Sequence, residues 1–445
     1  MMKKNKIQLK EHFGYRKLMR FTLPTITMMI FTSIYGIVDG FFVSNCVGKE
    51  PFSALNLIWP VVMILGSIGF MIGTGGSAYV SVKLGEQKKE DANRYFSMFL
   101  YLEVIVGVIL SIVGYIFARP IAGLLGAQGA VLDYCVVYGR VLFVGLVFFL
   151  LQNSFQSFLV VAEMPKFGLV VSVMAGVTNM ILDFLLVYVW KMGLFGAALA
   201  TVISQVVGAA IPVVFFIRNK KGLHLVSTGF EWRPIKQTCI NGSSEMVSNL
   251  SMSLISVLYN LQLMKYAGIN GVNAYGVVMY ISMIFAGVYM GYSIGVSPVI
   301  GYHYGAENKE ELKGLLRKSL KMIFVAAIVM TVAAECLSGL FAGIFVGYDK
   351  ELLEMTVRAN RLFSLAYLIC GFNMFASAFF TALGNGLISA VISFARTFLF
   401  QIIMIYLLPV FLGLNGLWLA MVVAEVLTSI VSIYFLVTKR RQYQY

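Results

Sequence analysis

Long apolar stretches, one after another along almost the whole chain, constrain its fold more than any other feature of the sequence. Each is longer than the roughly 20 residues that an α-helix needs to cross a bilayer core of about 30 Å. A helix satisfies its backbone hydrogen bonds within itself, and the short alternating segments of a transmembrane barrel are missing, so helices are the expected spanning elements. Twelve spans are predicted, at residues 21–45, 54–82, 95–118, 131–160, 167–189, 194–217, 240–264, 272–301, 319–346, 352–382, 387–411 and 413–437.

The composition agrees with a chain whose main solvent is lipid. Hydrophobic residues fill 59% of the 445 positions and charged residues only 12%, which is too little polar surface for a soluble globule of this size. The five cysteines show neither disulfide nor metal-ligand spacing and are interpreted as small buried hydrophobic residues. The basic amino-terminal segment leads into a full-length span without a small-residue cleavage site, so the first span is expected to be retained.

The distribution of basic residues predicts the orientation in the membrane. The formal net charge is +14, and with loops alternating between sides, 25 lysines and arginines fall on one side and five on the other. This imbalance is typical of the positive-inside rule, and it predicts that both termini and the central linker are cytoplasmic in a multi-pass protein of the cell (inner) membrane. Because the basic charge orients the chain, no nucleic acid partner is predicted.

The sequence also repeats itself, at a single offset of 220 residues that needs no gap from end to end. In so apolar a chain the polar and glycine matches carry the argument, and they include Gly75 with Gly295, Ser77 with Ser297, Gly85 with Gly305, Lys89 with Lys309, Asn153 with Asn373 and Gly193 with Gly413. Each repeat holds six spans, so we expect an all-α polytopic protein with two six-helix lobes related by a pseudo-two-fold axis along the membrane normal. The predicted lobes are 1–217 and 240–438, with a cytoplasmic linker at 218–239 and a cytoplasmic tail at 439–445.

Two facing bundles favour a transporter over other membrane functions. They leave a cleft near the midplane, where a rocking transporter binds its substrate before releasing it on the other side. A channel more naturally repeats as several subunits, and an enzyme needs a catalytic cluster, whereas His12, His224 and His303 all lie at predicted cytoplasmic edges and no nucleophile or phosphate motif occurs. We therefore predict a monomeric transporter of small organic molecules in the lipid bilayer, with no enzymatic activity and no cofactor.

The two repeats differ most in their polar residues. Four polar residues stand within spans of the first half, namely Asp39, Asn179, Asp183 and Thr201. The positions 220 residues later hold Tyr259, Leu399, Ile403 and Met421. A polar residue that only one half carries is not required by the common fold, so this asymmetry marks a functional centre in the amino-terminal lobe.

The chemistry of these four side chains suits a coupling ion. An acid deep in a membrane helix costs about 2.5–3.5 kcal/mol on insertion scales, and such acids usually face a bundle interior on an ion or proton pathway. Asn179 and Asp183 are four residues apart and share a helix face. With Asp39 and Thr201 they make a set of hard oxygen ligands for Na⁺ or for protons. The alternative is that each acid only hydrogen-bonds to neighbouring hydroxyls.

Further polar and helix-bending residues are weaker candidates. Pro24 precedes Asp39 on the same span and is a candidate hinge, because proline removes a helical hydrogen bond. Glu245, Arg396 and Glu425 belong to the second half alone and are candidates for a second-lobe polar group or for an interface ion pair. The remaining charged residues of the spans are interpreted as lying near span ends and extending toward the interface, namely Glu103, Arg140, Glu335, Arg358 and Arg361.

At this point the chain resembles the multidrug and toxic compound extrusion (MATE) family over nearly its whole length. The resemblance rests on Leu23-Pro24 to Val38-Asp39, Gly75 to Leu84-Gly85, Asn179-x-x-Leu182-Asp183 with Gly196-Ala197-Ala198 and Ala200-Thr201, Ser297-Pro298 through Tyr304-Gly305-Ala306, and Arg396 leading to Leu408-Pro409 and Gly413-Leu414-x-Gly416. Their order and spacing together are more specific than any one of them.

The resemblance implies twelve helices in two lobes and extrusion of organic, often cationic, compounds coupled to inward Na⁺ or H⁺. It also implies a cation site in the amino-terminal lobe at Asp39, Asn179, Asp183 and Thr201. The chain departs from branches with an acid mid-way along the seventh helix, since Glu245 lies near the start of that helix. A flippase for lipid-linked sugars or other lipids of the same superfamily is the second hypothesis. The major facilitator fold is the third, because its basic signature loop is missing from the segment Lys83 to Arg94.

Overall fold

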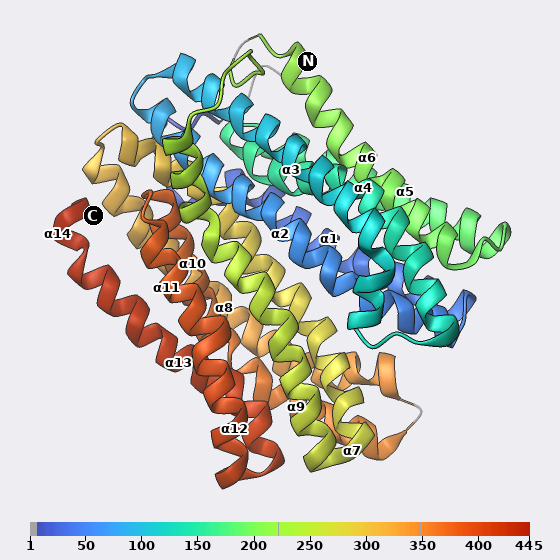
Figure 1. Cartoon of the computed structure of the whole chain (residues 1–445). Helices are drawn as coiled ribbons and strands as arrows, with labels where there is room; N and C mark the ends of the chain where they lie inside the picture. Colours follow the sequence, from blue (N-terminus) through green and yellow to red (C-terminus); the bar gives the residue numbers. More distant parts are fainter. Residues whose placement is uncertain (1–6, 221, 348) are drawn as a thin grey trace.

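The computed structural model describes residues 7–220, 222–347 and 349–445, without the side chains of residues 37, 39–41, 43–45 and 49. Within these ranges every regular element is a helix (Figure 1). The elements are α1 (Tyr15–Cys46), α2 (Lys49–Gly85), α3 (Lys89–Leu124), α4 (Gly129–Val161), α5 (Pro165–Leu182), η1 (Asp183–Val189), α6 (Gly193–Arg218), α7 (Trp232–Gly305), α8 (Lys309–Val346), α9 (Lys350–Ser364), α10 (Tyr367–Ala382), α11 (Gly386–Phe394), η2 (Ala395–Leu399), α12 (Phe400–Leu412), α13 (Leu414–Thr438) and α14 (Arg440–Tyr443).

These elements supply the twelve predicted spans. Among the described residues nine helices are long and apolar enough to cross a membrane, and α9 with α10 makes a further span that is bent by 46°. The 74 residues of α7 are two spans, because the helix is broken at Gly268, where φ is 62° and ψ is −152°. The two parts of α7 lie side by side, with the ring of Tyr259 stacked on that of Tyr275. The 32 residues of α1 supply the remaining span.

The duplication is visible in the backbone. Left-handed φ angles recur 220 residues apart at the helix junctions, at Gly48 and Gly268, at Gln87 and Glu307, and at Gly193 and Gly413. In Figure 1 the blue-to-green helices α1–α6 form one lobe and the yellow-to-red helices from α7 onward form the other. The chain passes between them from the end of α6 at Arg218 to the start of α7 at Trp232, within the stretch 218–239 assigned above to the linker.

The lobes meet closely on the side of the molecule that holds both chain ends, which we call the terminal side (along the upper-left edge of Figure 1). A Cβ atom added to Gly85 at the end of α2 would lie 2.1 Å from the carbonyl oxygen of Tyr302 in α7. A Cβ atom added to Gly305 at the end of α7 would lie 2.1 Å from the carbonyl oxygen of Val82 in α2. We call this contact the glycine seam. Its two halves are related by the same 220-residue repeat, so the lobes touch through equivalent surfaces.

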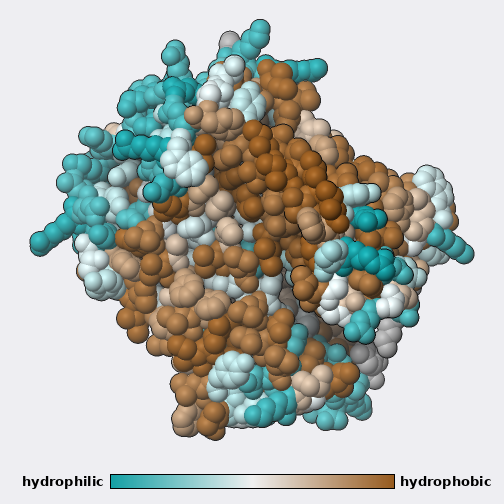
Figure 2. Space-filling model, in the orientation of Figure 1, coloured by the Kyte–Doolittle hydropathy of each residue, from teal (hydrophilic) through white to brown (hydrophobic). Residues whose placement is uncertain are grey.

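Side chains facing away from the bundle are apolar along most of the helix length. On α3 the exposed residues Ile105, Ile109, Ile112 and Ile116 follow one another every three or four positions and cover one helix face. Figure 2 shows the resulting hydrophobic surface, with hydrophilic residues gathered mainly along the terminal side at the upper left. An apolar surface of this extent is stable only in lipid.

Candidate functional site in the amino-terminal lobe and its counterpart

The fifth span changes its helical pitch at the predicted acid. The regular helix α5 ends at Leu182, and Asp183 begins the seven-residue π-helix η1. The side chains of Asn179 and Asp183 are 1% and 0% exposed, so both point into the lobe. A π-turn widens the helix by one residue per turn and is frequent at functional sites.

Helices α1 and α6 pack against α5 and η1, and they bring the other predicted ligands toward this region. Thr201 on α6 is 8% exposed, and its hydroxyl donates a hydrogen bond of 3.0 Å to the carbonyl oxygen of Ala197. The hydroxyl oxygen therefore keeps its lone pairs for a ligand. Asp39 belongs to α1, but its side chain lies outside the described residues, so its position relative to Asp183 stays a prediction.

The amide of Asn179 is the most informative group of the site. Neither its oxygen nor its nitrogen has a hydrogen-bond partner among the described side chains and backbone atoms, although both are buried. A buried polar group without a partner is rare and usually calls for a bound water or ion. With the carboxylate of Asp183 and the hydroxyl of Thr201, the amide oxygen offers the hard donor set that suits Na⁺, and the carboxylate alone suits a proton. No group of three or more His, Cys, Asp and Glu side chains gathers in the part of the chain that was searched.

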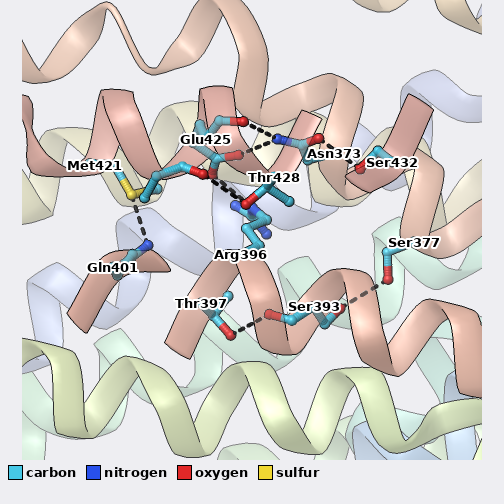
Figure 3. Close-up of polar contacts among 11 residues, drawn as sticks. Asn373, Ser377, Ser393, Arg396, Thr397, Gln401, Met421, Glu425, Thr428 and Ser432 are labelled. Carbon is cyan, nitrogen blue, oxygen red and sulfur yellow. Dashed lines mark hydrogen bonds and ion pairs between the residues drawn. The ribbon is translucent and has the colours of Figure 1, made fainter. Parts of the chain in front are cut away.

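The carboxy-terminal lobe buries an ion pair instead (Figure 3). The Nε of Arg396 in η2 donates to Oε1 of Glu425 in α13 over 2.8 Å, and Glu425 is 0% exposed. The amide nitrogen of Asn373 in α10 donates to Oε2 of Glu425 over 2.7 Å, and Ser432 donates to the amide oxygen of Asn373 over 2.9 Å. Both carboxylate oxygens are thus paired, which is the condition under which a buried charge is tolerated.

Glu245 completes this second group from a greater distance. It lies on α7, is half-buried, and interacts electrostatically with Arg396 without a hydrogen bond between them. Arg396 therefore faces two carboxylates, one bonded and one farther away. The three second-lobe candidates share one neighbourhood, while the amino-terminal candidates lie in the other lobe.

The two lobes place opposite charges in their fifth spans. Asp183 opens η1 and Arg396 lies in η2, so each buried charge sits in a π-helical segment. The two positions are not equivalent in the repeat, because the residues 220 positions away are Ile403 and Gly176. The helical irregularity is therefore placed separately in each lobe, next to the charge that lobe carries.

Pro24 is buried in α1, close to the contact between the lobes. A Cβ atom added to Gly295 of α7 would lie 2.4 Å from the hydroxyl oxygen of Thr25 and 3.1 Å from Cα of Thr22. The hinge candidate therefore lies in a stretch of α1 that packs on the other lobe.

One prediction about a charged residue is wrong. Glu103 was expected to lie near a span end and extend toward the interface, but it is 0% exposed in α3 and hydrogen-bonds to Ser154 of α4. Arg140, Arg358 and Arg361 are exposed, as expected. Hydropathy counts how apolar a segment is and not which way each side chain points, so a single acid in an apolar helix gives no sign of being buried. The nearest signal was the polar run in α4 from Gln152 to Ser157, which a lipid-facing helix would not need.

Comparison with known proteins agrees with this architecture. The family model MatE matches residues 24–185 and again residues 246–407, one match in each lobe. The Multidrug export protein MepA of Staphylococcus aureus (strain MSSA476) is 25% identical over 421 residues, which cover 94% of this chain and 92% of that protein. MepA of Staphylococcus saprophyticus is 24% identical over 408 residues, covering 91% and 88%.

Solved structures share the fold. A crystal structure of MATE in complex with MaL6 superposes with a TM-score of 0.93 at 23% identity, covering 98% of both chains. The outward-facing conformation of a multidrug resistance MATE family transporter of the MOP superfamily gives 0.92 at 23% identity with the same coverage. The twelve spans, the two repeated lobes and a family model that matches both of them identify the chain as a member of the MATE family of multidrug efflux transporters, a multi-pass membrane protein.

Proposed function

We propose that this chain is a secondary antiporter that extrudes organic, often cationic, compounds in exchange for Na⁺ or H⁺ by alternating access. The observation that carries the proposal is the buried, unpartnered amide of Asn179 beside Asp183 and Thr201, in a lobe whose repeat partner has only apolar residues at these places. A symmetric scaffold does not need this group for folding, whereas a coupling ion does. The curated relatives from the two Staphylococcus species are multidrug export proteins, which supports the substrate class.

The mechanism that we infer couples charge at this site to the arrangement of the lobes. Asp183 and Asp39 repel each other when both are ionised in a low-dielectric bundle, and a bound proton or Na⁺ removes that repulsion. The change is transmitted along α1, which carries Asp39 and Pro24 and packs against the second lobe around Thr25. Export then requires the glycine seam to open and close as the substrate site faces alternate sides.

We further propose that the terminal side is cytoplasmic, because it carries most of the lysines and arginines. The flippase hypothesis needs a cationic centre for a pyrophosphate group. Arg396, the arginine of the eleventh span, already faces the carboxylates of Glu425 and Glu245, which favours the antiporter.

The test is efflux of a fluorescent organic cation from loaded proteoliposomes, with Na⁺ and pH gradients imposed separately. We expect efflux with at least one gradient, and loss of that coupling in the double variant Asp39→Asn/Asp183→Asn, since asparagine keeps the shape but cannot titrate. Asp133→Asn is the matched control, because Asp133 is an exposed acid on α4 that is 69% accessible. Unimpaired gradient-driven efflux by the double variant would show that coupling resides elsewhere, and transport of a lipid-linked sugar in place of the cation would favour the flippase.

A further inference from the structure

A second acid is buried in the amino-terminal lobe, apart from the candidate cation site. Glu103 lies on α3, 14 residues after the helix begins at Lys89 and therefore about 21 Å along its axis. Its side chain is 0% exposed and is enclosed where α3 meets α4 and α2. Asp183, by contrast, belongs to the fifth span.

The hydrogen bonds around Glu103 identify its protonation state. The hydroxyl oxygen of Ser154 on α4 lies 2.5 Å from Oε1 of Glu103 and 2.9 Å from the carbonyl oxygen of Gly69 on α2. A serine hydroxyl has one hydrogen to donate, and a carbonyl oxygen can only accept. If the hydrogen of Ser154 goes to Gly69, the contact with Glu103 is a hydrogen bond only when Glu103 itself carries the hydrogen.

The surroundings make the charged form of Glu103 costly. Its second oxygen, Oε2, is buried without a hydrogen-bond partner among the described residues, and Ser154 is the only group that interacts with its carboxyl. Along α2 no titratable residue occurs between Glu50 and Tyr79, and along α4 none follows Arg140. An ionised carboxylate with one hydrogen bond and no cation nearby is far more costly in a low-dielectric interior than a neutral acid.

We propose that Glu103 is a proton-binding site that stays occupied at neutral pH, with the Glu103 hydroxyl donating to Ser154 and the Ser154 hydroxyl donating to Gly69. The proton links three helices, because each donor and acceptor comes from a different one. The helices α2 and α4 are already close at this point, since a Cβ atom added to Gly69 would lie 2.5 Å from the carbonyl oxygen of Leu150. The site is separate from ion coupling and holds α3 on the α2–α4 crossing.

Infrared difference spectroscopy of the full-length protein at neutral pH tests the assignment. A protonated carboxylic acid has a carbonyl stretch in a region free of carboxylate bands. We expect Glu103→Gln to remove one such band while efflux and helix content are retained. Ser154→Ala should shift that same band to higher frequency, because its donor bond is lost. The control Glu354→Gln, which changes an exposed acid on α9, should leave the band unchanged.

A second measurement follows stability against pH. The native protein holds one proton that the unfolded chain releases, so raising the pH favours unfolding by up to about tenfold in the equilibrium constant per pH unit. The melting temperature of the wild type should fall from neutral to alkaline pH more than that of Glu103→Gln. The proposal is overturned if Glu103→Gln removes carboxylate bands in place of a protonated-acid band, or if both proteins melt with the same pH dependence.

Discussion

Alanine substitutions in the glycine seam offer a direct test of how the lobes move. A Cβ atom at Gly85 would meet the carbonyl oxygen of Tyr302 at 2.1 Å, and one at Gly305 would meet that of Val82 at 2.1 Å, whereas real Cβ atoms essentially never approach closer than 3.0 Å. The obstacles are backbone atoms of the opposite lobe, which cannot turn away as a side chain does. The lobes must therefore part by about 1 Å at this seam if they are to accept both methyl groups.

The expected effect is a shift in the balance between conformations. Overpacking of this kind costs about 1–3 kcal/mol. The cost applies only to the arrangement that is closed on the terminal side, because the methyl groups face open space once the lobes separate. Alanine also favours the helix over glycine by about 0.5–1 kcal/mol in either arrangement, which leaves the balance unchanged. A difference of 1–3 kcal/mol corresponds to about a 5–150-fold shift toward the state open on the terminal side.

The assay is pulsed electron spin resonance between spin labels on cysteines introduced at Lys89 and Lys309, one at the terminal-side end of each lobe, with the native cysteines replaced. We expect the double variant Gly85→Ala/Gly305→Ala to populate longer distances than the parent. The control is Gly123→Ala/Gly343→Ala, another pair related by the repeat, at which an added Cβ atom meets nothing within 4 Å. Identical distance distributions in the parent and the seam variant would refute the reasoning.

Three other predictions can be checked with standard methods. Arg396→Met should lower the free energy of unfolding by about 3–5 kcal/mol, because it leaves the buried carboxylate of Glu425 without its cation, and Arg396→Met/Glu425→Leu should recover most of that loss in the same denaturation assay. Asn179→Leu should raise the melting temperature, since it removes an unpartnered buried amide, while it lowers ion-driven efflux; a drop in both would mean that Asn179 is structural. Cysteines placed in residues 219–237 should react with membrane-impermeant reagents only from the cytoplasm, and labelling from outside would overturn the proposed orientation.

The sequence by itself was enough to predict the class of fold, for a physical reason. Lipid offers no hydrogen bonds, so an apolar stretch of more than 20 residues has few alternatives to a spanning helix. The ungapped repeat then predicted two equivalent lobes, and the recurring left-handed angles at Gly48 and Gly268 agree with it. Even the break inside α7 follows from the repeat, because Gly268 occupies the place of Gly48, where the first and second spans are joined.

The candidate site was predicted only in part. Comparing the repeats selected Asn179, Asp183 and Thr201, and the structure buries all three, because a polar residue with no counterpart in the other lobe has a local reason to be there. The same comparison does not reveal that the fifth spans turn into π-helices at Asp183 and around Arg396, since a π-turn depends on how the surrounding helices pack and leaves no pattern in composition.

Partnerships between side chains were decided by the tertiary structure alone. Which carboxylate Arg396 would bind depended on the relative rotation of η2, α10 and α13, and these helices meet only after folding. Glu103 shows the same dependence more sharply. Its spacing along α3 is compatible with a lipid-facing or an inward position, and only the close crossing of α2 and α4 brings Ser154 and Gly69 to it. Sequence periodicity specifies which residues form a helix, whereas the rotation of that helix about its axis is chosen by packing against its neighbours.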